Sequence, residues 1–226
     1  MGLLDRWRRR PAQGTRPEEV GRRRRRRQAP PAEPVVNEAA LRETLQEDPN
    51  DAEAFDVLVE TVRARAAEAH VADDPAEGHE AEDARRAADN AVWALAEELA
   101  QSPRAWRPLL VLGRLSLHDD REAALRRLGI AAERDPSGTG LAQALAILRE
   151  AGMNDEALSL GVGHWRPREH DVEAGRHLVA AAIDAGRLAE ARRHLKALGE
   201  HPDQDRVAPM REELEDAIAR ADRAQR

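Results

Sequence analysis

The stretch EAALRRLGIAAERDP, which runs from Glu122 to Pro136, carries the pattern on which the fold of this chain depends. Ala124, Leu128 and Ala131 follow one another at intervals of four and three residues, so they share one face of a helix. Pro136 ends the run because proline lacks the amide hydrogen that a helical hydrogen bond needs. A helix with so narrow an apolar face needs neighbouring helices to cover it.

The same pattern recurs along the chain with a period close to 33 residues. The alanines at corresponding places are 33, 33 and 34 residues apart: Ala91, Ala124, Ala157 and Ala191. The prolines that end the helices are 33, 31 and 35 residues apart: Pro103, Pro136, Pro167 and Pro202. Gly152 and Gly186, in predicted turns, are 34 residues apart. Several independent features with one period predict helix pairs that stack on one another as a solenoid.

The composition favours helices throughout. Only five residues are aromatic, 35% are charged, and alanine, leucine, glutamate and arginine are abundant. We therefore expect an all-α protein. The chain has no cysteine, which excludes disulfides, thiolate metal sites and a cysteine nucleophile. Lys196 is the single lysine among 36 basic residues, as is typical of a GC-rich bacterial genome.

Helical periodicity and breaking residues place the helices. We expect them at about 38–47, 52–70, 82–101, 105–117, 120–134, 139–151, 155–164, 172–185, 188–200 and 207–223. Asn37 and Asp51 are the predicted N-caps of the first two helices. Pro108 and Pro209 are expected in the first turn of their helices, where proline is tolerated. The acidic, proline-containing segment 71–83 is a predicted loop insertion.

Residues 1–37 are predicted to be a disordered basic arm, because they are rich in proline and arginine and poor in apolar residues. Residues 1–34 hold eleven arginines against four acidic residues, a net charge of +7, while the remainder carries −14. The arm includes a continuous run of arginines: Arg22, Arg23, Arg24, Arg25, Arg26 and Arg27. Three interpretations stay open: contact with nucleic-acid phosphates, attraction to an anionic membrane, and a solvated arm that meets an acidic surface.

The periodic part, residues 38–224, resembles the tetratricopeptide repeat family. Ala124, Leu128, Ala131 and Pro136 match the small, large, small and proline positions of that family's second helix. Ala191 and Leu195 match in type, whereas Gly161 departs from the pattern. The resemblance implies a right-handed superhelix of antiparallel helix pairs, with residues 207–223 as a C-terminal capping helix. Another α-solenoid or an irregular helical bundle is the alternative.

The resemblance also implies a function, because the first helices of such pairs line a groove that binds peptides. The groove-facing candidates in this chain are Trp106, Leu110, Gln143, Arg149, Arg176 and His177. The last three would attract an acidic peptide, although ordinary solvated positions would carry the same residues. We therefore expect a protein–protein interaction scaffold that binds a peptide or helix of a partner protein. The alternative is a nucleic-acid-associated regulator or a peripheral membrane adaptor that is recruited through residues 1–34.

Other classes of chemistry find no support in the sequence. It has no phosphate-binding loop, dinucleotide fingerprint or nucleophile elbow, and its histidines lack the spacing of a metal site. We therefore expect no enzymatic activity, no cofactor, no metal and no small-molecule substrate. The chain also has no apolar run of membrane-spanning length, and from its first residues we expect no signal peptide. The expected location is cytoplasmic, with peripheral membrane attachment through the arm as a variant.

Overall fold

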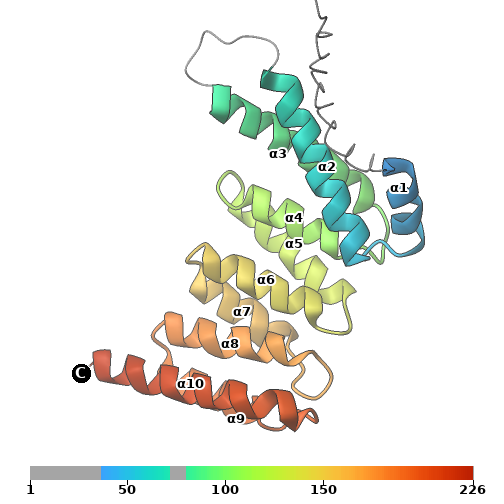
Figure 1. The fold of residues 1–226 in the computed structure, drawn as a ribbon. Helices are drawn as coiled ribbons and strands as arrows, with labels where there is room; N and C mark the ends of the chain where they lie inside the picture. The colour runs from blue at the N-terminus through green and yellow to red at the C-terminus, as the bar shows by residue number, and fades with distance from the viewer. Residues whose placement is uncertain (1–36, 72–79, 226) are drawn as a thin grey trace, which may run out of the picture. The chain divides into compact units, whose positions relative to one another are not determined.

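The computed structural model describes residues 37–71 and 80–225, and in these ranges all regular structure is α-helical (Figure 1). Ten helices follow one another: α1 (Glu38–Glu47), α2 (Ala52–Val71), α3 (Glu80–Leu99), α4 (Arg107–Ser116), α5 (Arg121–Arg134), α6 (Thr139–Glu150), α7 (Asn154–His164), α8 (Val172–Asp184), α9 (Leu188–Leu198) and α10 (Gln204–Ala224). The predicted all-α class is confirmed. Residues 1–36, which include Arg22–Arg27, lie outside the described residues, as does most of the predicted loop 71–83.

Side-chain caps begin several helices where the sequence places them. The Asn37 carboxamide oxygen accepts a hydrogen bond from the Ala40 amide at 3.3 Å, and the Asp51 carboxylate accepts one from Ala54 at 2.7 Å. These bonds satisfy amide groups that have no partner inside the first turn of a helix. Helices α4, α6, α7 and α9 have no such side-chain bond at their N-caps.

The two prolines expected in first turns have different outcomes. Pro108 is the second residue of α4, as predicted. Pro209 lies inside α10, so its predicted place in a first turn is wrong. The reason is the cap: the Asp203 carboxylate accepts a hydrogen bond from the Arg206 amide and starts the helix at Gln204. The predicted loop also ends early, because α3 begins at Glu80.

Contacts between helices follow a regular order. Each helix from α1 to α10 packs against the next, with α9 and α10 as the last pair. Alternate helices also touch: α4 with α6, α6 with α8, α8 with α10, and α5 with α7. This places α4, α6, α8 and α10 beside one another, in chain order (Figure 1). Such contacts are compatible with a helical repeat in which each unit touches its neighbours.

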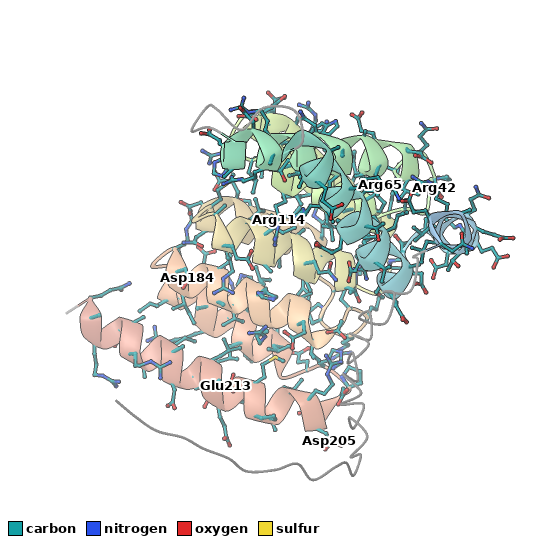
Figure 2. All side chains as sticks on the ribbon, turned by 45° about the horizontal axis from the view of Figure 1, so that its top comes forward. Arg42, Arg65, Arg114, Asp184, Asp205 and Glu213 are labelled. Carbon is teal, nitrogen blue, oxygen red and sulfur yellow. The ribbon has the colours of Figure 1, made fainter. Side chains whose placement is uncertain are left out.

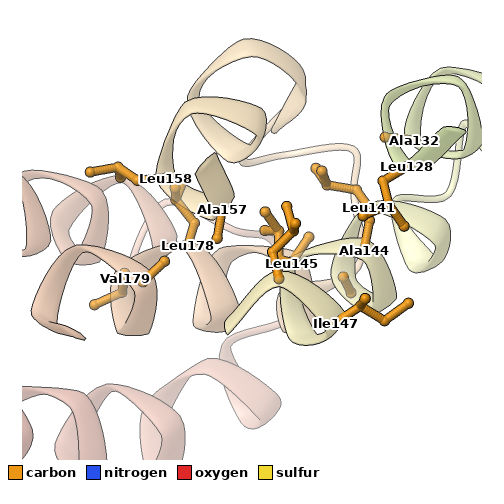
Figure 3. Close-up of a cluster of buried hydrophobic side chains, with 14 of the residues drawn as sticks. Leu128, Ala132, Leu141, Ala144, Leu145, Ile147, Ala157, Leu158, Leu178 and Val179 are labelled. Atoms are coloured by element: carbon orange, nitrogen blue, oxygen red, sulfur yellow. The ribbon is translucent and has the colours of Figure 1, made fainter. Parts of the chain in front are cut away.

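The core repeats with the same period as the helices. Leu112, Leu145 and Leu178 are 33 residues apart on α4, α6 and α8, and at most 3% of each is exposed. Figure 3 shows Leu178 beside Ala157 and Leu158 of α7, and Leu128 of α5 beside Leu141 of α6. These alanines and leucines belong to one cluster that extends from α3 to α10. A smaller cluster joins α1, α2 and α3.

Glycines admit large side chains at the helix crossings. A Cβ atom on Gly161 of α7 would lie 2.6 Å from Leu178 Cδ1. A Cβ atom on Gly113 of α4 would lie 2.7 Å from Leu128 Cδ2 of α5. Real Cβ atoms do not approach other atoms so closely, so the leucine fills the volume that the glycine leaves. The departure of Gly161 from the repeat pattern therefore has a physical reason: Leu178 occupies its space.

The two turn glycines make the same turn. Gly152 and Gly186 both have φ of +72°, a left-handed conformation that favours glycine. The amide after each glycine donates to a carbonyl five residues earlier, Met153 to Leu148 and Arg187 to Ala182, both at 2.8 Å. This is the bonding pattern of a Schellman motif, which ends a helix and turns the chain.

Two side chains fix the connection between α3 and α4. The Asn50 carboxamide oxygen accepts hydrogen bonds from the Trp106 and Arg107 amides at 2.9 and 3.1 Å. Arg134 at the end of α5 donates from Nη1 to three carbonyl oxygens of this connection at 3.0 to 3.2 Å. Residues 100–106 are therefore held by bonds from both the preceding and the following helix pair.

Candidate functional site

A cavity of about 340 Å³ lies where α6, α8 and α10 meet. It is lined by Thr139, Ala142, Gln143, Ala146, Asp171, Glu173, His177 and Arg206. Ala142 and Ala146 stand one turn apart on α6 and give the cavity an apolar side. The opposite side is polar and comes from the first half of α8 and from Arg206 of α10. Two of the predicted groove residues, Gln143 and His177, are thus brought together.

Gln143 of α6 contributes a polar side chain to this cavity. Its side chain is half-buried and makes no hydrogen bond with any residue in 37–71 or 80–225. A carboxamide offers two donor hydrogens and one acceptor oxygen, which is the complement of a peptide group. Gln143 therefore keeps its full hydrogen-bonding capacity for a molecule that enters the cavity.

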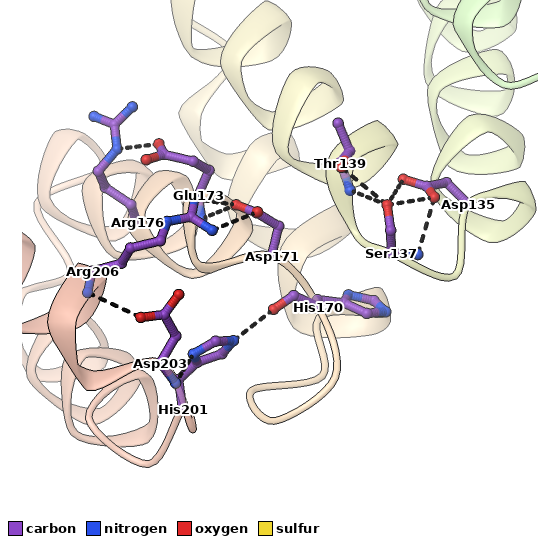
Figure 4. Close-up of polar contacts among 10 residues, drawn as sticks. All are labelled: Asp135, Ser137, Thr139, His170, Asp171, Glu173, Arg176, His201, Asp203 and Arg206. Atoms are coloured by element: carbon purple, nitrogen blue, oxygen red, sulfur yellow. Dashed lines mark hydrogen bonds and ion pairs between the residues drawn. The ribbon is translucent and has the colours of Figure 1, made fainter. Parts of the chain in front are cut away.

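An ion pair joins the start of α8 to α10 on the polar side of the cavity (Figure 4). Arg206 donates to both carboxylate oxygens of Asp171, at 2.9 and 3.0 Å. Asp171 also caps α8 by accepting a hydrogen bond from the Glu173 amide at 2.9 Å. The bond from Arg206 keeps the pKa of Asp171 below its usual value. A bidentate arginine–carboxylate contact fixes both side chains in one orientation.

Hydrogen bonds of the preceding loops fix the starts of α6 and α8. The Asp171 amide donates to the Ser137 carbonyl at 2.7 Å, which joins the loop before α8 to the loop before α6. Asp135 is buried, and its carboxylate accepts a hydrogen bond from the Gly140 amide at 2.6 Å. It also accepts one from the Ser137 hydroxyl at 2.7 Å (Figure 4). The cavity is therefore built on ordered loops rather than on side chains alone.

His177 lies between two arginines. Its Nδ1 atom is 3.1 Å from Arg149 Nη1, and its Nε2 atom is 3.5 Å from Arg176 Nη2. Burial lowers the pKa of His177 to about 4, and the two guanidinium charges act in the same direction. The imidazole is therefore neutral at pH 7.

The arginines predicted to attract an acidic peptide have carboxylate partners within the chain. Arg149 bonds to Asp184 through Nε and Nη2 at 3.0 and 2.8 Å, and Arg176 bonds to Glu173 at 2.5 Å. Arg114 and Glu150 form the corresponding pair between α4 and α6, at 3.0 Å. Figure 2 shows Arg114 and Asp184, which belong to these successive pairs. Because the charges are paired and His177 is neutral, the expectation of an acidic ligand loses its basis.

Trp106 and Leu110, the remaining predicted groove residues, lie in the core instead. Only 8% of Trp106 and 4% of Leu110 is exposed. The start of α6 packs on the indole, since a Cβ atom on Gly140 would lie 3.2 Å from Trp106 Cε3. These two side chains offer no surface to a ligand, and we do not include them in the candidate site.

Sequence reasoning missed the alanine side and the ion pair of this cavity. Ala142 and Ala146 were not distinguishable from core alanines. The Asp171–Arg206 pair had a signal, because its members are 35 residues apart, close to one period of the repeat. Oppositely charged residues separated by one period are candidates for contact between neighbouring units of a solenoid.

The described residues also offer no candidate metal site and no candidate membrane span. No group of three or more histidine, aspartate or glutamate side chains there is placed to hold a metal ion. None of the described helices combines the length and apolar character that a membrane span requires.

Comparisons of the chain with protein-family models, with curated proteins and with solved structures gave no match.

Proposed function

We propose that this chain is a non-enzymatic scaffold for protein–protein interaction, which binds a peptide segment of a partner protein on the face formed by α6, α8 and α10. The observation that carries this proposal is the cavity in which the unpartnered Gln143 carboxamide lies beside Ala142 and Ala146. The repeating contacts and turns support a tetratricopeptide-like, right-handed solenoid of antiparallel helix pairs as its architecture, with α10 as the capping helix.

The chemistry of the cavity indicates what kind of segment it accepts. Gln143 binds one peptide group through its amide and carbonyl, and the two alanines let the bound backbone approach α6 closely. The arginines on this face already pair with carboxylates of the chain. A charged segment would therefore gain little over an uncharged one, and we expect the segment to be uncharged. We therefore expect affinity that changes little with salt, because no ligand charge is involved.

Selection from a random peptide library, with the full chain immobilised, provides ligands to test the site. Gln143→Ala should weaken the selected peptides about five- to thirtyfold, which corresponds to about 1–2 kcal/mol for its hydrogen bonds. Gln101, an exposed glutamine away from the cavity, supplies the matched control Gln101→Ala, which should bind normally. Fluorescence anisotropy of labelled peptides measures both.

Two results would contradict the proposal. One is a library selection that yields no peptide whose binding depends on Gln143. The other is an affinity that falls steeply as salt rises, because the ligand would then be held by charge rather than by the carboxamide and the apolar wall.

A further inference from the structure

A second and larger cavity, of about 800 Å³, lies between α9 and α10. Its inner surface includes Leu195 of α9 and Ile218 of α10, of which 6% and 5% are exposed. Ala219 is exposed and also lines it. Charged residues of both helices surround this apolar strip. The cavity shares no residue with the one between α6, α8 and α10.

The order of helix contacts indicates which structural element would fit this cavity. Earlier in the chain, α7 packs against both α5 and α6. Helices α9 and α10 correspond to α5 and α6, since α10 packs against α8 as α6 does against α4. Within the described part of the chain, no further helix covers α9 and α10. The open cavity is therefore in the place that α7 occupies beside α5 and α6.

The helix in the equivalent place indicates the apolar pattern of the occupant. Helix α7 buries Ala157, Leu158 and Gly161 against its neighbours. Helix α5, of the same layer, buries Ala124, Leu128 and Ala131. Small residues with a leucine between them thus form the buried stripe, because they let the backbones of crossing helices approach closely.

The charges around the cavity indicate the polar pattern. Lys196 and Arg223 make no ion pair or hydrogen bond through their side chains with residues in 37–71 or 80–225. The glutamates are neutralised within the chain, since Glu200 pairs with Arg168 at 3.3 Å and Glu215 with Arg211 at 2.8 Å. The cations left without a partner favour acidic residues on the occupant.

We propose that the α9–α10 cavity is the docking site of one amphipathic helix from a partner protein, with a stripe of small residues and leucine flanked by glutamate or aspartate. This site shares no residue with the proposed peptide-binding face, so the two proposals can be tested independently. A partner bound here would extend the stack by the helix that follows α10 in the repeat order.

Two synthetic peptides serve as probes. One has the sequence of Arg121–Arg134, capped at both ends, which contains the Ala124, Leu128 and Ala131 stripe. The other carries Arg126→Glu and Arg127→Glu, which make it acidic. We expect the acidic peptide to bind the full chain saturably, with one site and about tenfold higher affinity than the native peptide. Because the chain itself has a net charge of −7, non-specific attraction would favour the native peptide instead.

Matched substitutions locate the binding. Ala219→Trp fills the cavity from an exposed position and should weaken the acidic peptide about tenfold. Ala208→Trp, also exposed on α10 but outside the cavity, should change nothing. Lys196→Glu should remove the preference for the acidic peptide, whereas Arg220→Glu, on α10 outside the cavity, should keep it.

Two outcomes would overturn the proposal. The first is that neither peptide binds saturably, or that Ala219→Trp and Ala208→Trp have equal effects. The second is a dimer of the full chain in sedimentation velocity that Ala219→Trp abolishes, because the cavity would then be filled by a second copy of the chain. Either result leaves the Gln143 test unaffected.

Discussion

Gly161→Ala adds a methyl group to α7 at a point where the neighbouring helices leave no room. The new Cβ atom would lie 2.6 Å from Leu178 Cδ1 and 3.4 Å from Leu145 Cδ1. Leu178 is fully buried, so it moves only by displacing other core side chains. Gly163→Ala, two residues later in the same helix, meets no atom within 4 Å and is the matched control.

The magnitude follows from two opposing effects. Overpacking at a buried crossing lowers the free energy of unfolding by about 1–3 kcal/mol. Alanine is a better helix former than glycine by about 1 kcal/mol, which acts in both variants. Gly161→Ala should therefore lower the stability by up to about 2 kcal/mol, while Gly163→Ala should raise it by up to about 1 kcal/mol.

Urea unfolding followed by circular dichroism at 222 nm measures the difference, provided that the slopes of the transitions are equal. Leu178→Ala alone should lower the stability by about 2–5 kcal/mol. In that background Gly161→Ala should no longer destabilise, so the pair shows a coupling energy of about 1 kcal/mol or more. If Gly161→Ala stabilises the chain as much as Gly163→Ala does, the described packing of α7 on α8 is wrong.

Three further predictions concern His177, Asn50 and Arg134. Between pH 6.5 and about 4 the unfolded chain protonates His177, whereas the folded chain does not, because it holds the pKa of His177 at about 4. The free energy of unfolding should therefore fall as the pH falls through this window. In His177→Gln the urea midpoint should fall less between pH 7 and pH 5 than it does in the unaltered chain. Asn50→Ala removes the acceptor of two amides, and a loss of about 1–2 kcal/mol is expected in the same assay; an unchanged midpoint would mean that water replaces the carboxamide. Arg134→Ala frees three carbonyls of residues 100–106, and amide hydrogen exchange should accelerate there but not in α9.

The helices and their caps could be predicted because their causes are local. The oxygen of Asn37 and of Asp51 reaches an amide three residues later, so a few residues determine where each helix begins. The turns at Gly152 and Gly186 were visible for the same reason, since glycine adopts positive φ readily. The failure at Pro209 is local too: Asp203 was not recognised as the cap, and it starts α10 earlier.

The candidate site could be predicted only in part because burial and pairing are decided by a neighbouring unit. The sequence predicts that Gln143, Arg149, Arg176 and His177 lie on two helices, and these are α6 and α8 in the structure. Their ion pairs could not be predicted, because the partner of Arg149 is Asp184, 35 residues away. Periodicity shows which residues recur, but the contact of one unit with the next decides which of them remain accessible.

The composition of helix α7 predicts where the array of helices unfolds locally first. It has eleven residues, two of them glycine, and Leu158 as its one large buried side chain. Local unfolding free energies follow the buried apolar contacts of each segment, so α7 should exchange its amide hydrogens fastest among the helices from α4 to α9. The regions before and after it would then behave as two cooperative folding units joined by a weaker one, and a ligand that contacts both α6 and α8 would stabilise the junction between them.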